Sequence, residues 1–322
     1  MKIVHCAVGL MIAISGSTAL AQTSKYPSRA VRMLVGFSPG GATDIIARLI
    51  SPGLTESLGQ SVVVENRPGA SSQIAGELVA KSAPDGHTLL MTSQTLMTSQ
   101  MIEKRTYPDL ARDFAAVALC ATSPLVLVVH PSLPVRSLKE LIALARARPG
   151  EMNYGSGGVG TTPHLSGELL ATMARLKLVH IPYKGEGPAI VDVLAGHLPF
   201  MFTNVTASNA HVQAGKMRAL AVTGPQRTPV VPGVPTLAES GLPGFEVVGF
   251  FGVMAPAGTS REIVAQLNAE IGKVLAGPDI RERFASQALD PGNKTAGQFG
   301  DYIKSEAGKW GKLIREAGIT TK

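Results

Sequence analysis

Two glycine-rich turns hold the residues of this chain that are best suited to binding chemistry. The first, Ser38-Pro39-Gly40-Gly41, lies between an apolar run at residues 31–35 and apolar residues at helical spacing from Ile45 to Leu54. Free N–H groups at a helix start, with the positive end of the helix dipole, attract an anion. The turn therefore predicts a site for a carboxylate or phosphate. An ordinary βα turn in which Thr43 or Asp44 caps the helix fits the same residues equally well.

The second turn, Gly155 to Gly160, has the G-x-G-x-x-G spacing of dinucleotide-binding proteins. It follows a short predicted strand and opens a helix, so its N–H groups form a second place for an anion. The acid that would hold a ribose hydroxyl about 20 residues later is absent, because the next strand ends in Pro182-Tyr183-Lys184-Gly185. A secreted or nucleotide-dependent enzyme that uses this turn is therefore the weaker alternative. A serine-hydrolase elbow is excluded, since Tyr154 stands where that motif needs a glycine.

Few residues are placed for catalysis or metal binding. The seven histidines show no zinc-binding spacing, so we predict neither a metal site nor a cofactor. His164, at the helix start beside the second turn, could donate to an anion or have a structural role alone. Asp44 and Glu65 are not a convincing acid/base pair, because nothing in the sequence fixes their separation. Two anion sites without a nucleophile, base or metal favour binding over catalysis, and we predict that the chain is not an enzyme.

Length and composition indicate a globular protein with two domains. The chain has 322 residues, of which 45% are hydrophobic and 16% charged, and its net charge is +7. Lysines and arginines are scattered rather than gathered with aromatic residues, which argues against a nucleic-acid partner. Cys120 is the one cysteine outside the first 21 residues, and its apolar neighbours predict a buried, inert thiol.

Residues 1–21 have the pattern of a cleaved signal peptide. Lys2 precedes an apolar run from Val8 to Ile14, and small residues end the segment at Ala19-Leu20-Ala21. The apolar run is too short to span a bilayer. We therefore predict export and a mature protein that begins at Gln22.

Strands and helices alternate along the rest of the chain, which is typical of α/β proteins with parallel sheets. The exits of the first three strands, near Ser38, Asn66 and Ser93, should share one sheet edge, where such folds bind ligands. A fresh start is predicted at Ser123-Pro124, and two α/β halves then face each other across a cleft. The predicted strands cover residues 31–35, 62–64, 88–92, 125–129, 152–154, 179–182, 200–202, 218–223 and 246–254. The predicted helices begin near residues 45, 74, 138, 165, 188, 207, 261, 279 and 295.

Several segments, in order along the whole mature chain, resemble the Bug-type extracytoplasmic solute receptors of tripartite tricarboxylate transporter systems. They are residues 35–44 (VGFSPGGATD), 64–70 (VENRPGA), 83–90 (APDGHTLL), 154–161 (YGSGGVGT), 180–185 (HIPYKG), 218–223 (RALAVT), 235–245 (PTLAESGLPGF) and 309–311 (KWG).

The resemblance implies an α/β, two-lobed periplasmic binding protein of type II-like fold, in which each lobe is a mostly parallel sheet flanked by helices. Lobe 1 would comprise residues 22–122 and 246–322, and lobe 2 residues 123–245, with hinge crossings near 120–124 and 245–250. Such a receptor closes by hinge motion on a small carboxylate and delivers it to the membrane components of a tripartite tricarboxylate transporter. We expect a periplasmic monomer. Delivery to a signalling protein instead remains an alternative.

The same resemblance implies that turns and strand exits of both lobes grip the ligand. Thr203 stands where the family usually has an acid, so we expect a carboxylate ligand without an ammonium group, unless Asp44 turns into the cleft as a partner for one. The expected ligand-binding residues are Phe37, Ser38, Gly40, Gly41, Thr43, Asp44, Thr92, Ser93, Ser156, Gly157, Gly160, Thr161, His164, Thr203 and Asn204.

Overall fold

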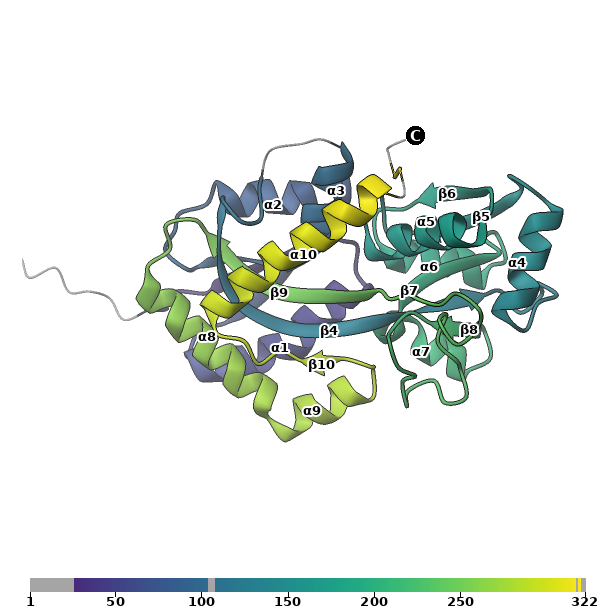
Figure 1. The fold of residues 1–322 in the computed structure, drawn as a ribbon. Helices are drawn as coiled ribbons and strands as arrows, with labels where there is room; N and C mark the ends of the chain where they lie inside the picture. Colours follow the sequence, from purple (N-terminus) through teal and green to yellow (C-terminus); the bar gives the residue numbers. More distant parts are fainter. Residues whose placement is uncertain (1–25, 104–107, 317, 320–322) are drawn as a thin grey trace, which may run out of the picture.

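Strand β4 (Phe114–Val129) runs through both halves of the molecule, and the two sheets are built on it (Figure 1). The computed structural model describes residues 26–103, 108–316 and 318–319, so the predicted signal peptide lies outside the described residues. The first half of β4 belongs to a sheet with the order β2-β1-β3-β9-β4, and the second half to a sheet with the order β4-β7-β5-β6. The chain is therefore a two-lobed α/β protein, as predicted.

In lobe 1, three parallel strands alternate with helices. The strands are β1 (Val31–Val35), β2 (Val62–Asn66) and β3 (Thr88–Ser93), and the helices are α1 (Ala42–Leu58), α2 (Gln73–Ala80) and α3 (Thr95–Glu103), with a 3-10 turn, η1 (Ala70–Ser72). Val35 pairs with Asn66 on one side and with Met91 on the other. The three strand exits therefore share one sheet edge, which confirms that prediction.

Lobe 2 repeats this arrangement. Its strands are β5 (Met152–Ser156), β6 (Leu178–Pro182), β7 (Phe200–Asn204) and β8 (Arg218–Val222), and its helices are α4 (Leu138–Ala147), α5 (Thr162–Ala174), α6 (Glu186–Leu194) and α7 (Val205–Gln213). Strand β5 is parallel to both β6 and β7, whereas β7 and β8 are antiparallel to β4.

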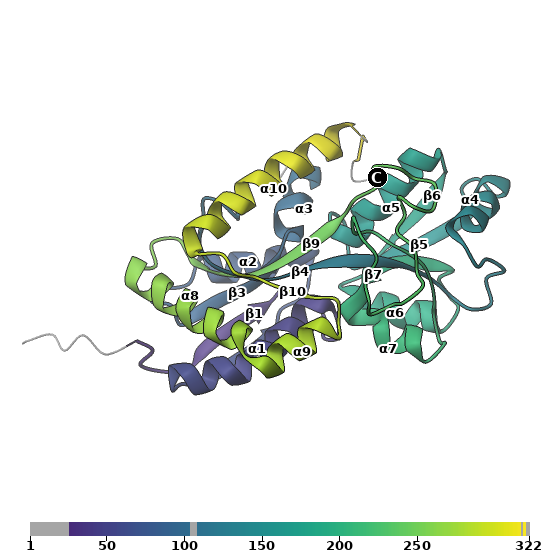
Figure 2. The ribbon, with the colours of Figure 1, turned by 60° about the horizontal axis from the view of Figure 1, so that its bottom comes forward.

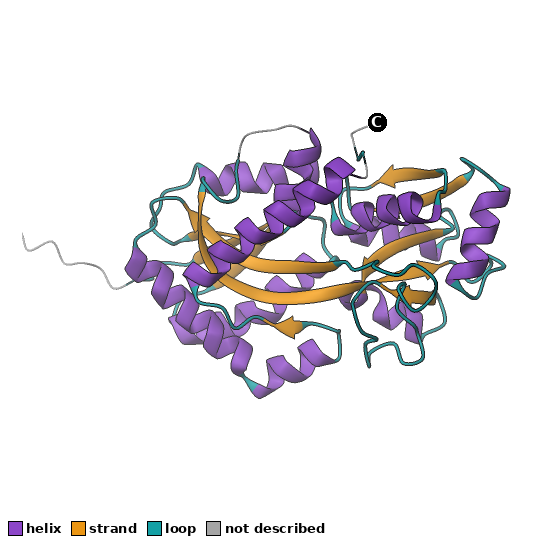
Figure 3. Cartoon of the chain, viewed as in Figure 1, coloured by secondary structure: helices purple, strands orange, loops and turns teal. Residues whose placement is uncertain are grey.

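The chain then returns to lobe 1 through β9 (Val248–Pro256), which lies antiparallel between β3 and β4. It ends with α8 (Arg261–Ala276), α9 (Pro278–Ala285), the short strand β10 (Asp290–Pro291) and α10 (Ala296–Glu316). Pro124 pairs with Val248 where the two long strands leave lobe 1 side by side. The lobes are thus joined by continuous strands, which Figure 3 shows in orange.

Helices cover both faces of each sheet. Figure 2 shows α2, α3 and α10 on one side of the lobe 1 sheet, and α1, α8 and α9 on the other. Leu34 and Leu90 belong to the core on the first side, and their neighbours Met33 and Leu89 to the core on the second. Successive strand residues point to opposite faces, so an apolar run such as residues 31–35 is buried on both sides. No helix in the described parts of the chain is both long and apolar enough to cross a membrane.

Four predictions about elements need correction. Both sheets are mixed rather than mostly parallel, because β4 and β9 run between the lobes and join each sheet antiparallel. The strand predicted to begin near Ser123-Pro124 is the second half of β4, which already starts at Phe114. Helix α3 was not predicted at all. Finally, Gly41 is the N-cap of α1, and neither Thr43 nor Asp44 caps it.

Candidate functional site

The starts of several helices from both lobes converge on one cavity that is partly open to solvent. The space in it that no atom fills, including the part open to solvent, is about 380 Å³. Lobe 1 contributes the starts of α1 and α3, and lobe 2 the starts of α5, α6 and α7. The lining residues are Phe37, Gly41, Ala42, Thr43, Ser93, Thr95, Gly157, Thr161, Thr162, Pro163, Glu186, Asn204 and Phe251. Because each helix start presents N–H groups and a positive dipole end, the cavity is suited to an anionic ligand.

On the lobe 1 side, the start of α1 is open to the cavity. Gly41 is extended at φ −85° and ψ 164°, and as a glycine it brings no side chain to cap the helix. The N–H groups of Ala42 and Thr43, in the first turn, have no carbonyl partner within the helix. The N–H of Gly40 is already used, since it donates to Asp44 Oδ2 at 3.1 Å.

Asp44 itself is held away from the cavity. Its Oδ1 accepts from Arg48 Nε at 3.0 Å and from Asn66 Nδ2 at 2.8 Å. Burial alone would raise the pKa of Asp44, but the hydrogen bonds from Arg48, Asn66 and Gly40 lower it below its usual value. Asp44 is therefore a charged group already paired with Arg48, and it does not face a ligand.

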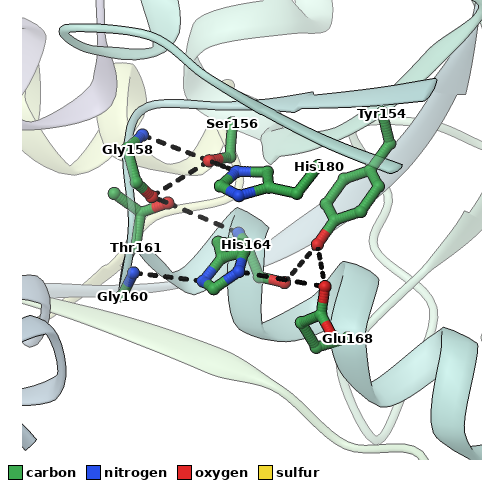
Figure 4. Close-up of polar contacts among 8 residues, drawn as sticks. All are labelled: Tyr154, Ser156, Gly158, Gly160, Thr161, His164, Glu168 and His180. Carbon is green, nitrogen blue, oxygen red and sulfur yellow. Dashed lines mark hydrogen bonds and ion pairs between the residues drawn. The ribbon is translucent and has the colours of Figure 1, made fainter. Parts of the chain in front are cut away.

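Buried side chains hold the glycine-rich turn of lobe 2, residues 155–160, through a network of hydrogen bonds that Figure 4 shows. Ser156 Oγ lies 2.6 Å from His180 Nε2 and accepts the N–H of Gly158 at 3.1 Å. His164 Nδ1 accepts the N–H of Gly160 at 3.1 Å. The two imidazole rings stack with their centroids 4.0 Å apart. These bonds fix the backbone of the turn, so Ser156 and His164 support the site and do not line it.

Both histidines of this network are neutral. Burial lowers the pKa of His164 to about 4, and burial together with the neighbouring His164 lowers the pKa of His180 to about 3. A neutral ring has one nitrogen without a proton, and His164 uses that nitrogen to accept the Gly160 N–H. The proposed donation from His164 to an anionic ligand is therefore not supported by this geometry.

Glu186, which the sequence analysis did not identify, places a carboxyl group in the wall of the cavity. Its Oε1 accepts from the backbone N–H of Asn204 at 3.2 Å and from Asn204 Nδ2 at 2.6 Å. Its Oε2 lies 3.5 Å from the N–H of Ala42 in the other lobe. Burial raises the pKa of this carboxyl group. The expectation that the cleft holds no acid other than Asp44 is therefore wrong.

The two lobes touch along the rim of the cavity, so the structure is the closed form. The N–H and hydroxyl of Ser38 both donate to the carbonyl of Lys184, at 3.2 and 3.0 Å. Ser71 donates to the carbonyl of Val159 at 2.6 Å, and Thr98 donates to the carbonyl of Gly160. The predicted site residue Ser38 thus joins the lobes instead of facing the cavity.

The structure brings about half of the predicted site residues together around the cavity. Those that line it are Phe37, Gly41, Thr43, Ser93, Gly157, Thr161 and Asn204. Those that lie behind the lining or at the lobe contact are Ser38, Gly40, Asp44, Thr92, Ser156, Gly160, His164 and Thr203. Thr203 and Thr92 are fully buried in strands. Thr161 lines the cavity while its hydroxyl caps α5 by accepting the N–H of His164 at 3.3 Å.

The sequence analysis missed three further residues of the lining, Thr95, Glu186 and Phe251. Glu186 is the first residue of α6, directly after Gly185, but the predicted helix began at Pro188. Thr95 begins the helix that was not predicted, and Phe251 lies in β9 one residue beyond the predicted hinge crossing. Phe251 and Phe37 are both buried and give the cavity apolar walls.

The sequence is similar to those of known receptors. The model of the tripartite tricarboxylate transporter family receptors matches residues 46–319. The protein BugT of Bordetella pertussis is 38% identical over 317 residues, which cover 98% of this chain and 97% of BugT.

Two solved structures share both the fold and part of the sequence. R. palustris Rpa4515 with adipate has a TM-score of 0.89 and 38% identity, covering 92% of this chain and 99% of that one. MatC from Rhodopseudomonas palustris with bound malate has a TM-score of 0.86 and 30% identity, covering 90% of this chain and all of the other.

Proposed function

We propose, from the premise that this chain belongs to the tripartite tricarboxylate transporter family of receptors, that it captures a small carboxylate in the cavity between its lobes. The family consists of periplasmic solute-binding receptors rather than enzymes. Two of the similar structures contain a small carboxylate: Rpa4515 is with adipate, and MatC has bound malate. The receptor releases its ligand to the membrane components of a tripartite tricarboxylate transporter.

One observation carries this proposal: helix starts from opposite lobes meet at one cavity between the lobes. Charge-assisted hydrogen bonds to a sheltered carboxylate contribute about 1.5–3 kcal/mol each. A few such bonds are enough for micromolar affinity, which needs about 8 kcal/mol. Phe37, Pro163 and Phe251 would contact the hydrocarbon part of the ligand. This donor set, with its apolar walls, fits an organic acid better than inorganic phosphate.

The proposal includes the organisation of the chain. Residues 1–21 direct export and are removed, so the periplasmic protein begins at Gln22. It acts as a monomer. Residues 22–122 and 246–322 form lobe 1, and residues 123–245 form lobe 2. The lobes move about the strands β4 and β9, because these are the segments that cross between them.

A thermal-shift panel tests the binding function. Purified protein that begins at Gln22 is melted with aliphatic and aromatic monocarboxylates, dicarboxylates, tricarboxylates, amino acids and, as a control, inorganic phosphate. A ligand at about 100 times its Kd adds about 2.7 kcal/mol to the free energy of unfolding, which raises the Tm by several degrees. The proposal is wrong if only phosphate or no compound raises the Tm. Delivery is tested separately by carboxylate uptake into vesicles that contain the transporter's membrane components, with and without the receptor.

A further inference from the structure

We propose that Glu186 and Asn204 select a ligand that carries an ammonium group as well as a carboxylate, and exclude ligands that place a second carboxylate at the same point. This inference rests on the proposed function, because it concerns the ligand class of the same cavity. The cavity lining offers two kinds of group. The helix starts offer N–H donors, whereas Glu186 and Asn204 offer oxygen acceptors.

Glu186 is the one ionisable side chain among the described residues that line the cavity. Its side chain is buried, and its hydrogen-bond donors are the backbone and amide groups of Asn204 and the N–H of Ala42. None of these donors carries a positive charge. Arg48 of α1 pairs with Asp44, and within the described residues no cation forms an ion pair with Glu186. A buried carboxylate without a cationic partner is costly, and a ligand ammonium group would supply that partner.

Asn204 adds a second acceptor that lacks a donor. Its Nδ2 lies 2.6 Å from Glu186 Oε1, and this contact requires the amide nitrogen to face the carboxylate. The amide oxygen must then point the other way. This Oδ1 is buried, and within the described chain it has no hydrogen-bond partner. Buried amide oxygens are nearly always bonded, so this atom indicates a donor that the ligand provides.

The Asn204 oxygen lies close to the start of α5. A Cβ added at Gly249 would lie 3.9 Å from Asn204 Oδ1 and 3.6 Å from Thr162 Oγ1, at the start of α5. The Asn204 oxygen and the helix start of α5 are therefore neighbours. A ligand carboxylate at the start of α5 would leave its ammonium group within reach of Asn204 and Glu186. Glu186 already meets the start of α1, where a second ligand carboxylate would be repelled.

Ligand pairs of equal length test this inference. Titration calorimetry at pH 7.5 compares 4-aminobutanoate with succinate, 5-aminopentanoate with glutarate, and 6-aminohexanoate with adipate, together with α-amino acids and their deaminated counterparts. We expect the amino-carboxylate of the best-fitting pair to bind at least about tenfold more tightly than its partner. In Glu186→Gln, which keeps the shape and removes the charge, this preference should fall by at least about tenfold. In Glu186→Asp, which keeps the charge, the preference should persist.

The control and the contrary outcomes separate the two proposals. Glu77→Gln removes a charge from an exposed Lys81 pair on α2 and should leave the preference unchanged. If the wild type prefers the dicarboxylates, or if Glu186→Gln keeps the wild-type preference, this inference is wrong while the carboxylate receptor stands. If neither member of any pair binds the wild type, this inference is wrong, and the proposed function fails as well only if no carboxylate of the thermal-shift panel raises the Tm.

Discussion

His164 and His180 show how side chains outside the cavity determine the shape of its wall. The two stacked rings lie beneath the lobe 2 turn, and each uses a ring nitrogen to hold a group of that turn. Protonation would place two positive charges 4.0 Å apart, measured between ring centroids, and would remove the acceptor that binds the Gly160 N–H. The turn therefore depends on both rings being neutral.

We predict that this pair makes the protein sensitive to mild acid. Both folded-state pKa values, about 4 for His164 and about 3 for His180, lie below the ordinary value of 6.5. The unfolded chain binds protons first, so the stabilisation is complete above pH 6.5 and is lost as the pH falls toward 4 and then 3. Each histidine should lower the free energy of unfolding by about 2 kcal/mol between pH 7.5 and pH 5.

Urea denaturation at a series of pH values measures this effect. His180→Gln should lose about half of the pH dependence, while His211→Gln, a half-buried histidine of α7 outside this network, should keep all of it. A free energy of unfolding that is flat between pH 7.5 and pH 5 would contradict the role given to the pair.

At the scale of elements, the uncapped start of α1 favours ligand binding over helix stability. Gly41 has the extended backbone of an N-cap, which aspartate adopts readily, and aspartate is a better N-cap than glycine. We predict that Gly41→Asp weakens carboxylate binding at least about tenfold. The new carboxylate would lie in the cavity beside Glu186, whose Cβ is 3.7 Å from the added Cβ, so it would add negative charge where the ligand docks. Repulsion from Glu186 would offset the stability that the new cap gives to α1.

Gly41→Asn is the matched variant, since asparagine caps a helix without a charge. Calorimetry and chemical denaturation of both variants separate charge from capping. If Gly41→Asp binds the ligand as tightly as the wild type does, the start of α1 is not part of the site.

The elements were predictable from the sequence where a pattern was unambiguous. The apolar runs of β1 and β3 and the periodicity of α4, with Ser137 as its cap, lie where they were expected. Helix α3 was missed because its Thr, Ser and Gln residues show no apolar stripe, yet they are buried beneath the cavity. The first half of β4 is rich in alanine, which favours helix, and it becomes a strand by pairing with β9 and β10. Pairing between distant segments leaves no local signal.

The candidate site was predictable at the level of its turns but not of its side chains. The turns identified Gly41, Thr43 and Thr161, because a glycine-rich exit before a helix is a local pattern. The sequence could not show that the N–H of Gly160 is bonded to His164, or that Arg48 turns Asp44 away. Glu186 reaches the cavity only because the two lobes meet there.

At the scale of the whole molecule, the closed form depends on a close approach of backbones. Gly160 of lobe 2 lies against Ser99 of lobe 1, so a Cβ at Gly160 would lie 2.4 Å from the Ser99 Cα. We predict that Gly160→Ala prevents full closure and weakens ligand binding at least about tenfold, because such overlap costs more than about 1.4 kcal/mol. Calorimetry measures the affinity, and small-angle scattering with saturating ligand reports the closure.

Gly150→Ala is the control for backbone strain. Gly150 has φ +83°, close to the +76° of Gly160, but an added Cβ there would meet nothing within 4 Å. Both variants should lose similar stability from the positive φ, and Gly150→Ala alone should bind normally. Equal affinities of the two variants would show that the contact between Gly160 and Ser99 does not limit closure.

The passage of β4 and β9 between the lobes also sets the order in which a growing chain can fold. When residue 245 has left the ribosome, lobe 2 has all its strands, but β3 and the first half of β4 still lack β9, the strand that lies between them. An unpaired strand edge invites pairing with other chains. Lobe 1 can therefore mature only after the C-terminal quarter has been made, which leaves the nascent chain incompletely folded for most of its synthesis. The export proposed for this chain would benefit from that delay, because the chain would cross the membrane before it folds.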